Sequence, residues 1–293
     1  MNKLLALGVL TAFATMPGSM AVAQNHEGVT AAEAAQRINI AGRQRMLSQR
    51  MAKAACLMAT DISFAAAYDQ LTQAYGLFER SEAALRIGDE VMGMHPETSA
   101  KVLDALAAVS QPWADYKVVI EKGIDGGTIE NADLDSLDSA SLDVLKYMNI
   151  AVFKTVRDYA AITEDVPLGL TITVDIAGRQ RMLTQKAIKE ACLMTVAADP
   201  TVHAERLAES IELFDQSLKA LRDGYEDVGV MAAPTREIDR KLLEVESLWQ
   251  PVKRTLDRAA NGEVLSKRDI SRVSRMSEPL LQTMNEAVGL YES

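Results

Sequence analysis

Apolar residues recur at the spacing of an α-helix along most of this chain. In residues 38–58, at about 100° per residue, Ile40, Leu47 and Met51 fall on one stripe that is typical of the buried face of a bundle helix. Outside the first residues the composition is rich in Ala, Leu, Glu, Asp, Met and Arg and poor in aromatic residues and proline, which favours helix over strand. We therefore expect an all-α protein with almost no sheet.

Capping and turn residues divide the first half of the chain into four expected helices. Thr30 with Glu33 forms the pattern of a capping box at the start of the first helix, and Pro112 should kink the third. The expected helices cover residues 30–60, 61–91, 99–122 and 131–162, with loops at 92–97 and 123–128. The second half repeats this plan, and its later helices should start at Asp199-Pro200, at Pro234 and at Ser266 with Asp269.

The two halves are copies of each other. Residues 38–58, INIAGRQRMLSQRMAKAACLM, recur as residues 174–194, VDIAGRQRMLTQKAIKEACLM, with fourteen of twenty-one positions identical. The same offset of 136 residues also pairs Phe78 with Phe214, Trp113 with Trp249 and Asn149 with Asn285. The repeat is therefore a whole domain, and we predict two tandem up-down-up-down four-helix bundles at residues 24–163 and 172–293, joined by a linker at 164–171.

The linker contains Pro167 and Gly169, which favour a break between the bundles over one fused helix. In an up-down-up-down bundle the last helix finishes at the same end of the bundle at which the first helix starts. A turn in the linker therefore makes the first helices of the two copies parallel. The repeated segments would then face each other across a pseudo-twofold axis within a monomer. If the chain continued straight, the bundles would stack end to end, and each segment would need a second molecule, as in a homodimer.

The first 23 residues have the pattern of a secretory signal peptide. Lys3 precedes an apolar run at residues 4–16, Pro17-Gly18 breaks this run, and Ala21-Val22-Ala23 forms an A-x-A cleavage site. The run is shorter than the roughly 20 residues that span a bilayer, and no later segment is apolar for long enough. We therefore expect a soluble protein, exported to the periplasm, that does not span the membrane after signal cleavage.

The charge disfavours two classes of partner. The formal net charge is -10, and it becomes -11 once Lys3, the one charged residue of the signal peptide, is removed. This charge argues against nucleic acid and against an anionic lipid surface. Any anion site must therefore be a local exception.

A second stripe on the repeated helix carries the candidate chemistry. It consists of small residues around one arginine, Arg45 in the first copy and Arg181 in the second: Ala41, Arg45, Ser48, Ala52, Cys56 and Ala59, then Ala177, Arg181, Thr184, Ile188, Cys192 and Thr195. Small residues let another helix approach closely, and an arginine among them is costly to bury without an anionic partner. Two such arginines would repel each other, and a small planar oxyanion between them could accept paired hydrogen bonds from both. Gly42 and Gly178 would let backbone or ligand come near.

The string IN-x-AGRQRMLSQRMAK resembles the signature of the PilJ-type domain, the N-terminal extracytoplasmic module of type IV pilus methyl-accepting transducers. It is also similar to the periplasmic helix of nitrate- and nitrite-responsive sensor histidine kinases. The resemblance implies a four-helix sensor in which a symmetric pair of arginines, here Arg45 and Arg181, holds nitrate. Asp175 departs from this pattern by replacing the asparagine seen at Asn39, and we expect no membrane-spanning helix or cytoplasmic output module in this chain.

On this basis the expected ligand is a small oxyanion, nitrate or nitrite, sensed or carried by a periplasmic protein without a cofactor. The candidate ligand-binding residues are Arg45, Arg181, Gly42, Gly178, Ser48, Thr184, Gln49, Gln185, Arg43 and Arg179. The alternative function is a protein-interaction module that docks on a membrane-bound sensor, receptor or kinase and binds no small molecule. Its docking surface would be the small-residue stripe.

Each candidate also has a structural interpretation. Arg45 and Arg181 could form salt bridges to Glu79 or Asp215 in a neighbouring helix. For four basic residues a solvated helix face is the expected role: Arg43, Arg50, Arg179 and Lys186. We expect Gln44 and Gln180 to be buried hydrogen-bonding partners.

Cys56 and Cys192 are repeat equivalents, and an exported protein with two cysteines can form a disulfide. The bond requires Cα atoms within about 7 Å, which only the face-to-face arrangement provides. The alternative is that both remain packed free thiols, because buried cysteine behaves as a small hydrophobic residue.

Other motifs favour structure over catalysis or metal binding. Trp113 and Trp249 should be core anchors at the bundle ends, and the methionines should fill the core. The acidic residues Asp133, Asp135, Asp138 and Asp143 lack the glycine and terminal glutamate of a calcium loop and indicate a solvated face. The sequence has no Glu-x-x-His pair, no haem attachment motif, no phosphate loop and no nucleophile elbow, so we expect no metal and no enzyme activity.

Overall fold

The computed structural model describes residues 29–159 and 168–292. The predicted signal peptide at 1–23 and residues 164–167 of the predicted linker lie outside these ranges. Within them the chain is all-α, and its β-type pairing is limited to two isolated bridges, Asp89 with Met94 and Tyr225 with Val230.

The first repeat contains α1 (Ala31–Ala59), α2 (Phe64–Ile87), α3 (Ala100–Ala107), α4 (Ser110–Gly126) and α5 (Leu134–Tyr159). The second contains α6 (Leu168–Leu193), α7 (Thr201–Asp223), α8 (Arg236–Ala260) and α9 (Lys267–Glu292). The predicted starts at Thr30 and Ser266 are confirmed, because their side chains accept hydrogen bonds from the backbone N–H groups of Glu33 and Asp269.

Several predicted boundaries are wrong. The third helix of the first repeat is not one kinked helix: it is broken at residues 108–109, and Pro112 lies in the first turn of α4, where its missing N–H costs nothing. The predicted loop at 123–128 is helical through Gly126, and the predicted linker is helical from Leu168.

The second helix ends at Ile87 and not near residue 91, because Gly88 adopts φ +77. A Cβ at this position would lie 2.5 Å from the carbonyl oxygen of Met94, so only glycine fits. The chain turns here into the bridge between Asp89 and Met94.

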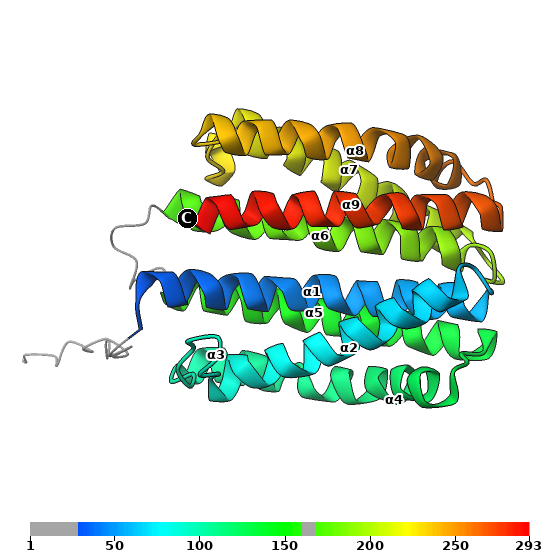
Figure 1. Cartoon of the computed structure of the whole chain (residues 1–293), viewed down its shortest axis with the longest axis horizontal. Coiled ribbons are helices and arrows are strands. Elements are labelled where there is room, and N and C mark those ends of the chain that lie inside the picture. Colours follow the sequence, from blue (N-terminus) through cyan, green and yellow to red (C-terminus); the bar gives the residue numbers. More distant parts are fainter. Residues whose placement is uncertain (1–28, 160–167, 293) are drawn as a thin grey trace, which may run out of the picture.

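The two bundles lie side by side, with α1 and α6 parallel at the centre (Figure 1). In the same view α5 lies next to α1 and α9 next to α6, while α2, α4, α7 and α8 form the outer parts. Cys56 and Cys192 form a disulfide across this interface, with 6.2 Å between their Cα atoms. The face-to-face arrangement of the repeats is therefore confirmed, and the free-thiol alternative is wrong.

Each bundle has an aromatic anchor halfway along its length rather than at its end. Trp113 stacks on Phe78 with 4.0 Å between ring centroids, and Trp249 packs on Phe214 at 4.1 Å. Both tryptophans are buried, as predicted, but the middle position corrects the expectation of bundle ends. None of the described helices is long and apolar enough to cross a membrane.

Candidate functional site

Arg45 lies in the middle of α1 and points into the interface between the repeats, with 1% of its side chain exposed. Its Nη2 donates to Asp175 Oδ1 on α6 at 2.6 Å, and its Nη1 donates to Asn149 Oδ1 on α5 at 3.2 Å. Its Nε lies 3.4 Å from the carbonyl oxygen of Gly42, one turn earlier. The guanidinium therefore joins three helices from both repeats.

Arg181 repeats this arrangement from α6. Its Nη2 donates to Asn39 Oδ1 on α1 at 2.8 Å, its Nη1 donates to Asn285 Oδ1 on α9 at 3.0 Å, and its Nε lies 3.4 Å from the carbonyl oxygen of Gly178. Each arginine thus contacts the last helix of its own repeat and the first helix of the other. The pseudo-twofold axis passes between them.

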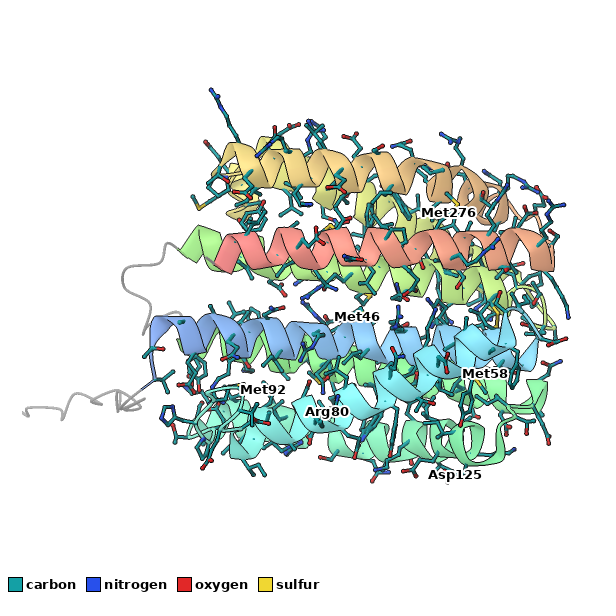
Figure 2. The ribbon with its side chains drawn as sticks, viewed as in Figure 1. Met46, Met58, Arg80, Met92, Asp125 and Met276 are labelled. Atoms are coloured by element: carbon teal, nitrogen blue, oxygen red, sulfur yellow. A yellow bond between two sulfur atoms is a disulfide. The ribbon has the colours of Figure 1, made fainter. Side chains whose placement is uncertain are left out.

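The two guanidinium groups face each other beside Gly178. A Cβ placed on Gly178 would lie 3.3 Å from Arg181 Nη2 and 3.7 Å from Arg45 Nη2, so both nitrogens approach one point on the α6 backbone. A Cβ on Gly42 would likewise lie 3.3 Å from Arg45 Nη2. The glycines of the repeated motif therefore leave room for the two side chains. Figure 2 shows Met46, the neighbour of Arg45, between α1 and the second repeat.

Burial and the nearby charges act against each other at this site. Burial lowers the pKa of Arg45, and the Asp175 carboxylate opposes that shift. Burial would raise the pKa of Asp175, but Arg45 and Arg179 outweigh it and hold this pKa below its usual value. Both groups therefore remain charged near neutral pH.

The site lies next to solvent on the side of the two asparagines. Asn149 and Asn285, which bond the Nη1 atoms of the two arginines, are exposed, whereas Arg45 and Arg181 are buried. On this side exposed asparagine residues therefore lie between the buried guanidinium groups and solvent.

The predicted intramolecular partners of the arginines are wrong. Glu79 accepts from the indole N–H of Trp113 at 2.7 Å, and Asp215 accepts from that of Trp249 at 2.7 Å. The acid that pairs with Arg45 instead comes from the other repeat, at the position where Asp175 departs from the motif.

Four predicted polar ligands lie one turn further along the same helices. Ser48 donates to the Arg45 carbonyl oxygen at 2.9 Å and Thr184 to that of Gln180 at 3.0 Å, so both hydroxyls are satisfied by their own helix. Gln49 Nε2 donates to the Ser141 carbonyl oxygen at 3.0 Å. Gln185 is fully buried, and neither of its amide atoms has a partner in the described part of the chain.

The remaining basic and amide residues of the motif divide into two groups. Gln44 and Gln180 donate to the carbonyl oxygens of Phe78 and Phe214, which confirms their structural role. Arg179 is exposed, as expected, and binds Asp175 Oδ2. Arg43 is only partly exposed, because its Nη2 donates to Ser81 Oγ at 3.0 Å, which corrects the expectation of a fully solvated residue.

Comparison with known proteins agrees with this geometry. The family described as type IV pili methyl-accepting chemotaxis transducer N-terminal, PilJ, matches residues 30–138 and 169–273, one match in each repeat. The chain belongs to the PilJ family. Its two PilJ repeats are thus sensory-type domains similar to the N-terminal domain of chemotaxis transducers, and they pack face to face within one polypeptide.

A relative of the PilJ repeats supports the same assignment. The methyl-accepting chemotaxis protein McpN of Pseudomonas aeruginosa is 31% identical over 122 residues, which is 41% of this chain. The aligned segment spans 22% of the length of that relative. The similarity therefore concerns one repeat-sized part of a longer protein.

Beyond the arginines, ion pairs join the two PilJ repeats toward the disulfide. Arg50 binds the Glu278 carboxylate on α9 through both terminal nitrogens, at 3.0 and 2.7 Å, and Lys53 Nζ lies 3.4 Å from the same carboxylate. Arg50 was expected on a solvated face, and this cross-repeat pair corrects that expectation. Burial lowers the pKa of Lys53 to about 8, with Glu278 opposing the shift.

The second repeat has an equivalent cluster around Lys189, which is fully buried. Its Nζ lies 2.5 Å from Asp138 Oδ1 on α5 and 3.0 Å from Glu190 Oε1. Arg206 binds the other Asp138 oxygen at 2.8 Å, and His203 Nδ1 lies 2.7 Å from Glu190 Oε2. Asp138 was expected on a solvated face, and its burial in this ion cluster corrects that expectation.

Within the described residues, this cluster also contains a group that could hold a metal ion. The possible ligand atoms of Asp138, Glu190 and His203 lie within 4.8 Å of one another. The ammonium group of Lys189 already provides a cation between the two carboxylates. The arrangement thus works as an ion network that joins the repeats.

Sequence reasoning missed the asparagines that orient the arginines. Asn149 and Asn285 each lie 104 residues after the arginine they bind, and they occupy equivalent positions of the two repeats. A polar residue that recurs at this offset on an otherwise variable helix is a signal that the sequence contains.

Proposed function

We propose that this protein binds a small planar oxyanion, nitrate or nitrite, between Arg45 and Arg181. One observation carries the proposal: two repeat-equivalent, buried arginines direct their Nη2 atoms to the same point beside Gly178 across the interface of the repeats. Buried like charges at such close range repel, and an anion between them converts that repulsion into two attractions.

The hydrogen-bonding capacity of Arg45 agrees with this proposal. Its Nη1 and Nη2 each carry two protons, and each donates to one acceptor, Asn149 and Asp175. One proton on each terminal nitrogen remains for a ligand. A planar anion with two oxygens on one edge matches these two donors better than a spherical ion does.

We further propose that binding takes place in the periplasm and that a membrane-bound receptor or kinase reads the occupied state. The proposal rests on the predicted signal peptide and on the PilJ family, whose description names chemotaxis transducers. The interface between the repeats is the element that an anion would tighten, because it brings charges from α1 and α6 together.

The structure gives no specific support to a ligand-free docking module. The small-residue stripe that such a module would present is used within the chain, because Ala41, Ala52 and Cys56 are buried where α1 packs on α6. An external helix would have to displace the second repeat to reach it.

Isothermal titration calorimetry of the oxidised protein with sodium nitrate and sodium nitrite tests the proposal. We expect saturable binding in the wild type and its loss in a variant that carries both Arg45→Gln and Arg181→Gln. The matched control is Arg254→Gln, which changes an exposed arginine on α8 and should leave binding unchanged. Circular dichroism melts verify that each variant is folded.

Two results would count against the proposal. Nitrate binding that persists in the folded double variant would place the site elsewhere. The absence of binding by the wild type to either anion would reject nitrate and nitrite as ligands.

A further inference from the structure

The paired arginine site is unsymmetrical at one pair of repeat-equivalent positions. Arg181 Nη2 meets the neutral amide oxygen of Asn39 at 2.8 Å, whereas Arg45 Nη2 meets the carboxylate of Asp175 at 2.6 Å. The two arginines also share two equivalent contacts, because Asn149 and Asn285 are equivalent and so are Gly42 and Gly178. The carboxylate is thus a chemical difference between the surroundings of the two Nη2 atoms.

Asp175 is held firmly as a charged group. Its Oδ1 accepts from Arg45, its Oδ2 accepts from Arg179 at 2.8 Å, and its side chain is 13% exposed. A carboxylate that is fixed in this way lies next to Arg45 Nη2, one of the two nitrogens that approach the same point beside Gly178, and it cannot turn away without breaking both pairs. The negative charge of Asp175 would repel any anion bound between the arginines.

We propose that Asp175 sets the charge class of the ligand: it is a built-in anion at the paired arginine site, which then accepts a monovalent oxyanion and rejects a divalent one. The inference rests on the proposed oxyanion site. Among the buried or nearly buried groups, Arg45, Arg181 and Asp175 together carry a formal charge of one positive unit, whereas Arg179 is 52% exposed and solvent screens its charge. One monovalent oxyanion neutralises this group, and a divalent oxyanion leaves a buried negative charge.

The duplication supplies an internal control for this idea. Arg43 follows Asn39 by four residues, as Arg179 follows Asp175, so a carboxylate at position 39 has an arginine at the same helical spacing. Exchanging the two residues, with Asn39→Asp and Asp175→Asn in one chain, therefore moves the carboxylate to the position related to Asp175 by the pseudo-twofold axis. Asparagine and aspartate have nearly the same shape, so the single variants Asp175→Asn and Asn39→Asp change the charge of the site by one unit without changing its size, and the exchanged variant restores the wild-type charge.

Calorimetry at constant ionic strength, with sodium nitrate and sodium sulfate as probes, tests the inference. Removing one negative charge several ångströms from the ligand should raise nitrate affinity of Asp175→Asn by roughly ten- to a hundredfold. The logarithm of the gain should be about twice as large for sulfate, because the interaction scales with ligand charge. Asn39→Asp alone should lose nitrate binding, and the exchanged variant should return to the wild-type affinities.

The outcomes separate this inference from the proposed site. If the wild type and Asp175→Asn bind nitrate and sulfate equally well, the role of Asp175 is rejected while the oxyanion site stands. If the wild type fails to bind nitrate but Asp175→Asn binds it, Asp175 blocks the site and the proposed ligand of the wild type is wrong. If neither the wild type nor Asp175→Asn binds either anion, both proposals are rejected, and if the wild type alone binds nitrate, the role of Asp175 is rejected while the oxyanion site stands. An exchanged variant that behaves like Asn39→Asp would show that position, and not charge, is decisive.

Discussion

Lys53 and Lys189 occupy equivalent positions in the two repeats and are both fully buried, yet their surroundings differ. Lys53 shares the carboxylate of Glu278 with Arg50, and the Glu278 side chain is 36% exposed. Lys189 lies between two carboxylates, of which Asp138 is 9% exposed and Glu190 is fully buried. The same ammonium group is thus a surplus cation in one cluster and the main counter-ion in the other.

The comparison shows which features the duplication has kept. Both lysines come from the first helix of a repeat, and both pair with an acid from the last helix of the other repeat. The acids themselves are not equivalent, since Asp138 corresponds by sequence to Ser274. As at the paired arginines, the cations of the interface are preserved and the anions differ.

Replacing Lys189 should have the largest effect. Lys189→Met would leave Asp138 and Glu190 buried together without their shared cation, which typically costs about 3–5 kcal/mol. Urea denaturation followed by circular dichroism measures this loss of unfolding free energy. The triple variant that adds Asp138→Asn and Glu190→Gln should recover part of the loss, and a Lys189→Met variant as stable as Lys53→Met would contradict the comparison.

Removing the disulfide should have the next largest effect and should act on both clusters equally. Cys56 and Cys192 lie one turn beyond the two lysines, and their bond closes a loop of 136 residues. The double substitution to serine should lower the unfolding free energy by about 2–4 kcal/mol. Thermal melts of the oxidised protein, the reduced protein and the double variant measure the effect, and a reduced protein as stable as the oxidised one would contradict it.

Lys53→Met should stabilise the protein at pH 7, by about 1–2 kcal/mol. It removes a buried ammonium group with a lowered pKa, while Glu278 keeps both hydrogen bonds from Arg50. The same denaturation experiment measures the change. A destabilisation comparable to that of Lys189→Met would show that the two clusters are energetically alike.

The smallest effect is the pH dependence of that stabilisation. Below pH about 8, native and unfolded Lys53 are both protonated, and the cost of the buried charge is fully present. Between about 8 and 10.5 the unfolded chain holds a proton that the native lysine has lost, so the Lys53 contribution to stability rises with pH. The difference between wild type and Lys53→Met should therefore shrink from pH 7 to pH 10, and a constant difference would exclude this cause.

Much of the fold follows from sequence because the duplication repeats every structural signal. The capping residues Thr30 and Ser266 mark helix starts that depend on local hydrogen bonds, and the apolar stripe marks the bundle face. The break before α4 was missed because Pro112 is tolerated in a first helical turn, and the early end of α2 depends on a left-handed glycine that sequence shows only as a residue type.

The candidate site was predictable in part. Arg45 and Arg181 stand out because a charged residue recurs among small ones. Their partners could not be predicted, since Asp175 and Asn149 reach Arg45 from helices whose rotation and register are set by packing and not by the local pattern. For the same reason Asp138 was assigned to a solvated face although Lys189 and Arg206 enclose it.

The central claim is that the two PilJ repeats build one anion site between them, and the stoichiometry of nitrate binding tests it most directly. Calorimetry of the oxidised wild type should give one nitrate per chain, and Arg45→Gln and Arg181→Gln should each abolish binding although each leaves one arginine intact. Two nitrates per chain, or a single variant that still binds half the wild-type amount, would contradict a shared site.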